Sequence, residues 1–190
     1  MHIVLIANAP SVARTRVYDA LAEQSASAGK RFYVLYCAKH ESDRSGSYDS
    51  VNMRHAHTVL RGFHPSLTGI HAHINPGVLA ELNLLKPDTL LMAGPWNIPT
   101  FLLAGLNIYT PAPRRFYWPD QASCVLKPCR GLMGWGKRRI LSKFDGYVLN
   151  VASTDSLVSG MTLCNKQAIV LPALGEAKHL AKLLINGLYP

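Results

Sequence analysis

Several polar and aromatic side chains stand directly after runs of apolar residues, at points where a buried strand would end. In LLMAGPWNIPTFLLA (90–104), an indole and an amide separate an apolar run from a helical pattern. An indole offers a flat apolar surface, and an amide both donates and accepts hydrogen bonds. The carboxyl ends of parallel strands form the edge at which open sheets bind ligands. The candidate substrate-binding residues at such positions are Asn8, Ser11, Trp96, Asn97 and Trp118.

Asp120, in FYWPDQ, is the candidate catalytic residue. It stands just after an apolar run and two residues past Trp118, where a carboxylate could accept a proton from a substrate hydroxyl. Alternatives stay open at this edge, because Asp120 can be a structural turn residue and Trp96 can close a strand end in the core. The sequence contains no GxSxG and no HExxH motif that would indicate a serine hydrolase or a zinc protease.

The segment NAPSVARTR (8–16) begins a predicted helix without the glycine pattern of a nucleotide-binding loop. It has neither GxGxxG nor GxxxxGK[ST], which weakens a role in binding NAD, FAD or ATP. Asn8, Ser11 and the amides of the helix N-terminus could nevertheless hold an anion. Arg14 and Arg16 can assist such binding or be plain surface residues.

Histidines recur as HAH at 55–57 and 71–73. Alternation would place each pair on one face of a strand, as two metal ligands require. No cysteine or carboxylate lies at a supporting spacing, so the sequence predicts no metal and no bound cofactor.

The segment KPCRGLMGWGKRRILSK (127–143) holds six cations and no acid, within a chain of net charge +9. Apolar groups among cations suit an anionic membrane surface, and the alternative is a solvated face whose apolar residues point to the core. Binding to nucleic acid is not predicted, because no aromatic cluster marks a sheet face. The candidate membrane or anion contacts are Lys127, Arg130, Trp135, Lys137, Arg138 and Arg139.

Apolar runs of strand length alternate with helical patterns along the chain. Continuous apolar strands belong to a parallel sheet that is covered on both faces. We therefore expect an α/β protein with a Rossmann-like, doubly wound, mainly parallel sheet of six to seven strands. The predicted strands are 2–7, 31–37, 57–60, 89–93, 114–118, 146–151 and 167–172. The predicted helices are 11–29 (with Ser11 as N-cap), 75–88 (with Asn75 as N-cap), 97–107, 135–144, 153–163 and 175–187, and a long polar loop is expected at 39–55.

Length and composition bound the class of protein. The 190 residues, 48% of them hydrophobic, suit one domain, expected at 1–174 and followed by a C-terminal helix and tail at 175–190. No run of about 18 apolar residues predicts a membrane span. The first residues lack the basic start of a signal peptide, and the four cysteines form no CxxC pair. We expect a cytoplasmic protein, at the inner face of the membrane if the basic segment binds lipid.

The order and spacing of these segments resemble the N-terminal half of a family 4 glycosyltransferase of the GT-B fold. The resemblance extends to about Leu174 and is carried by KPDTLLMAGPWNIPT (86–100), WPD (118–120), KRRILSKFDGYVLNVAST (137–154) and KQAIVLPAL (166–174). Each motif is weak alone. The family commonly has a histidine after its fourth strand and a glutamate at the position that Asp120 occupies, and this chain has neither.

The resemblance implies a domain that binds a lipid-linked or polysaccharide acceptor, with Trp96 stacking on a sugar and Asn97 binding a hydroxyl. It implies that a second domain, absent from this sequence, binds the nucleotide-sugar donor, and that another subunit or a second copy could supply it. The loop holding Asn8 and Ser11 would approach the donor phosphates. The alternative is a non-catalytic or degenerate Rossmann-like binding module.

Overall fold

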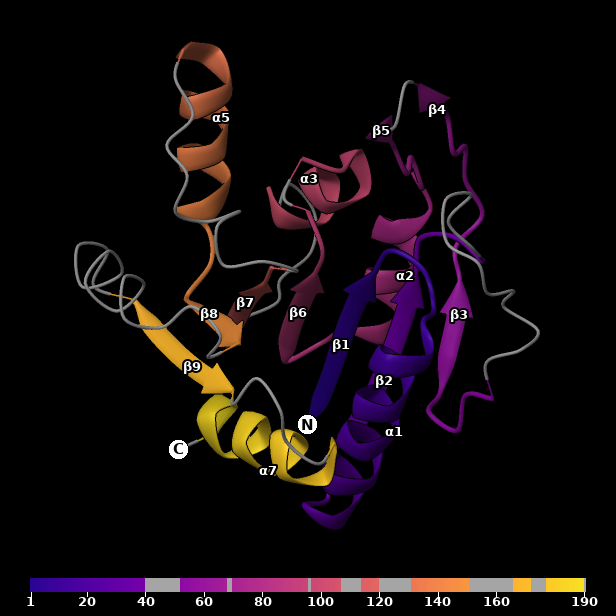
Figure 1. Cartoon of the computed structure of the whole chain (residues 1–190), viewed down its shortest axis with the longest axis vertical. Coiled ribbons are helices and arrows are strands. Elements are labelled where there is room, and N and C mark those ends of the chain that lie inside the picture. Colours follow the sequence, from indigo (N-terminus) through magenta and orange to yellow (C-terminus); the bar gives the residue numbers. More distant parts are fainter. Residues whose placement is uncertain are drawn as a thin grey trace.

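The computed structural model describes residues 1–39, 52–67, 70–95, 97–106, 114–119, 131–150, 166–171 and 177–189. Within these residues, the centre of the molecule is a seven-stranded parallel sheet in the order β3-β2-β1-β6-β7-β8-β9 (Figure 1). The predicted Rossmann-like class is confirmed. The strands are β1 (His2–Ala7), β2 (Arg31–Tyr36), β3 (His57–Val59), β6 (Thr89–Ala93), β7 (Arg114–Trp118), β8 (Gly146–Asn150) and β9 (Gln167–Leu171).

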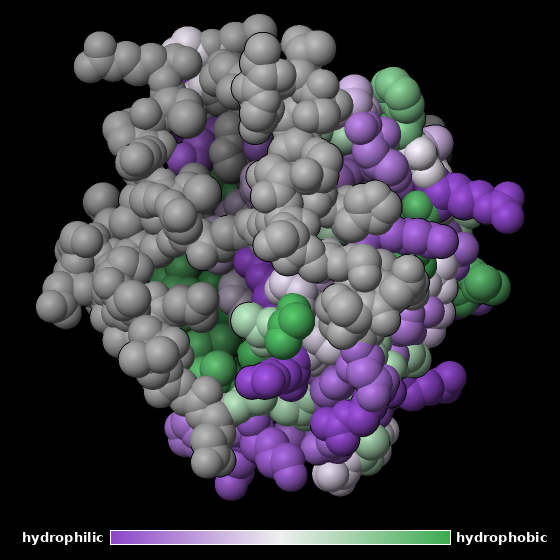
Figure 2. Space-filling view, turned by 45° about the vertical axis from the view of Figure 1, so that its right-hand side comes forward, coloured by the Kyte–Doolittle hydropathy of each residue, from purple (hydrophilic) through white to green (hydrophobic). Residues whose placement is uncertain are grey.

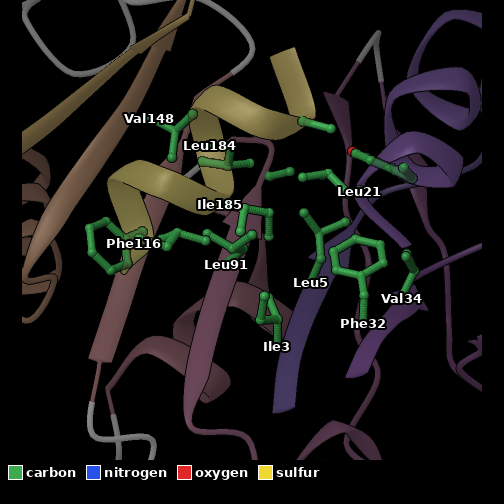
Figure 3. Close-up of a cluster of buried hydrophobic side chains, with 14 of the residues drawn as sticks. Ile3, Leu5, Leu21, Phe32, Val34, Leu91, Phe116, Val148, Leu184 and Ile185 are labelled. Carbon is green, nitrogen blue, oxygen red and sulfur yellow. The ribbon is translucent and has the colours of Figure 1, made fainter. Parts of the chain in front are cut away.

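Helices cover both faces of this sheet. The described helices are α1 (Val12–Ser27), α2 (Val78–Leu85), α3 (Pro99–Gly105), α5 (Gly131–Leu141) and α7 (Ala177–Leu188). Helices α1 and α7 pack on one face, and α2, α3 and the end of α5 pack on the other. Figure 3 shows the first of these cores, in which Leu184 and Ile185 of α7 lie over Leu91 and Phe116 of the sheet and Leu21 of α1 lies alongside.

Alternate residues of the central strands β2, β1, β6, β7 and β8 supply the two cores. In β1, Ile3 and Leu5 face α1 and α7, whereas Val4 and Ile6 face the opposite set of helices, and all four are fully buried. Successive side chains of a strand point to opposite faces, so a sheet covered on both sides needs apolar residues throughout. This requirement explains why the strands appear in the sequence as unbroken apolar runs.

The ends of α1 follow from local signals in the sequence. Ser11 is the N-cap, as predicted, and its hydroxyl accepts a hydrogen bond from the Arg14 amide at 3.4 Å. After the helix, Gly29 adopts a φ of 67°, a left-handed conformation that costs glycine little. The chain can therefore turn at once into β2.

The predicted role of Asn75 as an N-cap is wrong. Gly77 occupies the N-cap position of α2, and no side chain caps this helix. The Asn75 side-chain amide instead donates to the carbonyl oxygens of Cys37 at 2.9 Å and Leu60 at 3.3 Å. These carbonyls lie just beyond the ends of β2 and β3, where no further strand pairing satisfies them. Asn75 is fully buried and ties the two strand ends together.

A short antiparallel ribbon was not predicted. Strands β4 (Ser66–Leu67) and β5 (Ile70–His71) pair with each other, and an isolated bridge joins Phe63 to Ile74. These elements are too short to show a period-two pattern in the sequence. The ribbon lies beside α3, at the end of the molecule toward which β1, β2 and β6 point (Figure 1).

Helix α7, which begins two residues into the predicted tail, is part of the main core. Its residues Ala181, Leu184, Ile185 and Leu188 are buried on the α1 face of the sheet. Just beyond the helix, Tyr189 forms a 2.7 Å hydroxyl–hydroxyl hydrogen bond with Thr89, the first residue of β6. The tail segment thus closes the amino edge of the sheet.

Some predicted elements lie outside the described residues, namely the helix at 153–163 and positions 40–51 of the long loop expected at 39–55. Among the residues that are described, no helix is both long and apolar enough to cross a membrane. Hydrophilic side chains predominate over the described surface in the view of Figure 2.

Replacing Gly146 with alanine should destabilise the fold by about 1–3 kcal/mol or more, because an overpacked core forces its backbone to shift. A Cβ at this position of β8 would lie 2.5 Å from the Gln167 carbonyl oxygen and 2.8 Å from the Phe116 ring. Urea unfolding measures the effect. The control is Gly136→Ala in α5, where a Cβ meets nothing within 4 Å, and a gain of about 0.5–1 kcal/mol is expected. Equal unfolding midpoints for Gly146→Ala and wild type would contradict this account.

Candidate functional site

The order of the strands reverses around β1. The chain runs outward from β1 to β2 and β3, then returns to place β6 on the other side of β1. Helix α1 leaves β1 on one face, and α3 leaves β6 on the opposite face. The loops after β1 and β6 therefore diverge, and such a switch point is where open α/β sheets bind ligands. Asn8 and Ser11 lie in the first loop, and Gly94 and Asn97 lie in the second.

At their first residues, Gly94 and Asn8, the two loops still lie against each other. It has a φ of 150°, and a Cβ there would lie 2.9 Å from Asn8 Oδ1 and 2.9 Å from the Phe101 ring. Two bonds to β7 hold it, since its amide donates to the Trp118 carbonyl at 3.1 Å and its carbonyl accepts from the Tyr117 hydroxyl at 2.7 Å. Glycine is required because any side chain would push the two loops apart. The sequence analysis placed Gly94 at this join but gave it no role.

Asn8 has an unsatisfied side-chain oxygen at this point. Its backbone carbonyl accepts from the Ala38 amide at 2.9 Å, but its Oδ1 is buried without a hydrogen-bond partner. Leaving a buried acceptor unpaired costs about 1–3 kcal/mol. The residue as a whole is half-buried, so a turn of the amide can direct it to a ligand. The Oδ1 atom of Asn8 would therefore gain a hydrogen bond from a ligand that donates one.

Ser11 and the start of α1 form the second polar wall. The Ser11 hydroxyl is engaged as the helix cap, and the first turn contains no acidic residue. The unpaired amides of a helix N-terminus carry a partial positive charge, which favours an anionic or hydroxyl-bearing group. This wall complements the neutral amide of Asn97, which is exposed just before α3.

Trp118 is held by packing. The register aligns Tyr36, Ala7, Ala93 and Trp118 in one row at the carboxyl edge of the sheet. The two alanines leave room for Tyr18 of α1, whose ring contacts Trp118 edge-on at 6.2 Å and Tyr36 at 6.5 Å. Trp118 is half-buried, so only part of the indole can meet a ligand. The structure therefore gives Trp118 a packing role in addition to its predicted binding role.

The remaining predicted residues divide into two groups. On α5, Trp135 is 60% exposed and Arg138 and Arg139 are exposed, whereas Lys137 is buried with 5% exposure. Lys137 therefore does not share the outer face of the helix with the other three. The predictions that lie outside the described residues are Trp96, Asp120, Lys127 and Arg130.

A buried polar network that the sequence analysis missed lies next to this edge. Asp19 Oδ1 is 2.6 Å from His55 Nδ1, and His55 Nε2 is 3.0 Å from the Tyr36 hydroxyl. The carboxylate also accepts the backbone amides of Arg54 and His55, at 2.9 and 3.0 Å. Asp19 on α1 thereby anchors the segment that leads into β3. The sequence did contain a signal that Asp19 is buried, because Asp19 stands four residues after Thr15 and so shares the buried face of α1.

The protonation states in this network follow from its contacts. Burial acts to raise the pKa of Asp19, but the His55 side chain and the two backbone amides outweigh it, and the pKa lies below its usual value. Burial lowers the pKa of His55, and the Asp19 carboxylate opposes only part of this shift. We therefore assign an ionised Asp19 and a neutral His55. Nδ1–H of His55 donates to Asp19, and Nε2 accepts from Tyr36.

Comparisons with protein-family models, with curated proteins and with solved structures found no match for this chain. The described polar groups at the switch point are two amides, one hydroxyl and a helix N-terminus, which suit hydrogen bonding to a polar ligand. The predicted catalytic base, Asp120, follows Pro119 directly and so comes two residues after β7 ends.

The His55 network should make stability depend on pH. Because the pKa of His55 is lower in the folded state, the unfolded chain binds a proton first, and stability should fall as pH drops below about 6.5. His55→Gln removes this titration and should cost about 1–3 kcal/mol at pH 7.5. Urea unfolding at pH 7.5 and 5.5 should show the difference between wild type and variant shrinking with acidification.

The matched control for this experiment is His179→Gln, since His179 is exposed on α7. It should keep the pH dependence of the wild type. Parallel loss of stability in the wild type and in His55→Gln would show that His55 does not carry the effect.

Proposed function

We propose that this chain binds a sugar-bearing ligand in the crevice between the ends of β1 and β6, as the acceptor-binding domain of a glycosyltransferase. The observation that supports this most is the reversal of strand order at β1, a position at which open α/β sheets bind ligands, with Asn8 and Asn97 in the two loops that leave it. A Rossmann-like sheet serves many functions, so the argument concerns the groups at the crevice and not the fold.

The chemistry of the crevice favours a hydroxyl-rich ligand. Each sugar hydroxyl donates one hydrogen bond and accepts others, and the amides of Asn8 and Asn97 can do both. The unsatisfied Oδ1 of Asn8 needs a donor, which a hydroxyl supplies and a bare phosphate does not. The N-terminus of α1, with no acid in its first turn, suits the phosphates of a nucleotide sugar.

The proposed reaction is transfer of a sugar from a nucleotide-sugar donor to a lipid-linked or polysaccharide acceptor. Asp120 would accept the proton of the attacking acceptor hydroxyl, and Trp96 would stack on the acceptor sugar. Gly94 is hydrogen-bonded to Trp118 at the end of β7, and Asp120 follows two residues later in the sequence. A donor-binding domain, from another subunit or a second copy, would complete the enzyme.

Titration calorimetry with a panel of nucleotide sugars and oligosaccharides tests the binding step. We expect at least one ligand to bind, and Asn8→Ala to weaken it by about 5–10-fold, the value of one hydrogen bond of about 1–1.4 kcal/mol. Asn97→Ala should weaken it similarly. Asn186→Ala is the control, because Asn186 is exposed on α7, which closes the amino edge of the sheet.

The same experiment can refute the proposal. Binding that is unchanged in both Asn8→Ala and Asn97→Ala would place the ligand elsewhere. An absence of binding across the panel would favour the alternative, a Rossmann-like module without catalytic function.

The outer face of α5 supports a lipid-linked acceptor at the cytoplasmic face of a membrane. Trp135, Arg138 and Arg139 are spaced i, i+3 and i+4, which places them on one side of the helix, and all three are exposed. An exposed indole among arginines suits the interface of an anionic bilayer. Helix α5 projects away from the sheet at one side of the molecule (Figure 1).

Co-sedimentation with phosphatidylglycerol vesicles tests this contact. The double variant Arg138→Gln/Arg139→Gln should bind about 10–30-fold more weakly, since each cation at an anionic surface contributes about 1 kcal/mol. Trp135→Ser should also weaken binding. Lys178→Gln/Lys182→Gln removes two exposed charges from α7 and is the control. Equal losses in the two double variants would show that net charge, and not the α5 face, governs binding.

A further inference from the structure

The ribbon beside α3 brings two histidines together by its register. Phe63 and Ile74 exchange both backbone hydrogen bonds, each at 3.0 Å, and the Ala72 amide donates to the Pro65 carbonyl at 3.1 Å. His64 and His73 therefore face each other as the non-hydrogen-bonded pair between these two. Such pairs hold their side chains closest in an antiparallel ribbon.

The two imidazole rings approach each other through their Nδ1 atoms. His64 Nδ1 lies 3.1 Å from His73 Nδ1, and the ring planes meet at 63°. Two ligand nitrogens at about 2.05 Å from a metal stand about 3.3 Å apart in a tetrahedral site and about 2.9 Å apart in an octahedral one. The observed separation falls between these values. The same separation also fits an N–H···N hydrogen bond, which a metal ion would replace.

One histidine is fixed and the other is accessible. His73 is buried with 3% exposure, and its carbonyl accepts from the Thr100 amide at 3.1 Å and lies 2.7 Å from the Thr100 hydroxyl. Asn75 continues this anchorage toward the sheet, because its backbone amide donates a hydrogen bond to the Thr100 hydroxyl at 3.0 Å. His64 is exposed and gives an ion a path from solvent. A preorganised ligand and an open side are what a binding site requires.

The other close histidine pair does not offer such a site. The rings of His55 and His57 are 5.6 Å apart, but His55 Nδ1 is bonded to Asp19 and its Nε2 to Tyr36. Both nitrogens of that ring are occupied in a buried network. In the His64–His73 pair, the Nδ1 atoms of the two rings instead face each other at 3.1 Å.

We propose that His64 and His73 bind one divalent transition-metal ion, of the class of Zn²⁺ or Cu²⁺, between their Nδ1 atoms. Neutral imidazole is a preferred ligand of these ions. Each ring then carries its proton on Nε2, so no net proton is released. Among the described residues, no group of three or more metal-binding side chains occurs, and the proposal assigns the remaining coordination positions to water. The proposal is independent of sugar binding in the crevice.

Zinc titration of the full chain, first stripped with a chelator, tests the proposal. Calorimetry should show one equivalent bound by the wild type, and His64→Gln should weaken binding by about tenfold or more. Because His64 is exposed, this variant should fold normally, which circular dichroism checks. The control, His179→Gln, removes an exposed histidine from α7 and should leave the affinity unchanged.

Nitrogen NMR of the histidine rings identifies the ligands directly. Zinc should shift the Nδ1 resonances of His64 and His73 together, and His73→Gln should abolish the shift at His64. The proposal is overturned if the wild type shows no saturable zinc binding. It is equally overturned if His64→Gln binds zinc as tightly as the wild type does, or if the shifts appear only at other histidines.

Discussion

The arrangement of the helices follows from the handedness of the connections around β1. Crossovers between parallel strands are almost always right-handed, so a change of direction along the sheet moves the connecting helix to the other face. Helix α1 connects β1 to β2 on one face, and α2 and α3 accompany the return to β6 and the step to β7 on the other. The same reversal separates the loops after β1 and β6. The placement of the helices and the separation of these two loops therefore both follow from the reversal of strand order at β1.

Helix α7 follows the last described strand and covers part of one face of the sheet. Leu91, Phe116 and Val148 lie on this face, on β6, β7 and β8. Helix α7 covers them and packs against α1 (Figure 3). Burying three such side chains contributes about 1.5–3 kcal/mol each relative to exposure, which is large against a typical net stability of about 5–15 kcal/mol. The C-terminal helix is thus a structural necessity for the sheet.

The polar groups of the carboxyl edge differ in what they can do. The Asp19–His55–Tyr36 network is buried and internally paired, so it fastens β3 and its leading segment to α1. The amides of Asn8 and Asn97 stand in the two loops that leave the switch point, and each can both donate and accept a hydrogen bond. The His64–His73 pair belongs to a third class, because its two Nδ1 atoms face each other at 3.1 Å, with one ring buried and the other exposed. The three groups differ in whether their polar atoms have partners within the protein and in how exposed they are, although all three are built from common polar residues.

The sequence by itself determined the strands of the main sheet, most helix positions and the Rossmann-like class. Strands β1, β6 and β7 match their predicted limits, because an unbroken apolar run shows directly that both faces are buried. Ser11 could be recognised as a cap because it acts on an amide three residues away. These signals come from residues that are close together in the sequence, so they can be recognised without the tertiary structure.

Tertiary structure alone decided which residues meet across the chain. Asn75 was predicted to cap the helix beside it, but it serves carbonyls 38 and 15 residues away. His55 finds Asp19 at a separation of 36 residues, and Gly94 is constrained by Asn8 from another loop. His64 meets His73 only because the register of a short ribbon sets them opposite each other. A side chain's partner depends on where the sheet and its crossovers place distant segments, and that placement is a property of the whole fold.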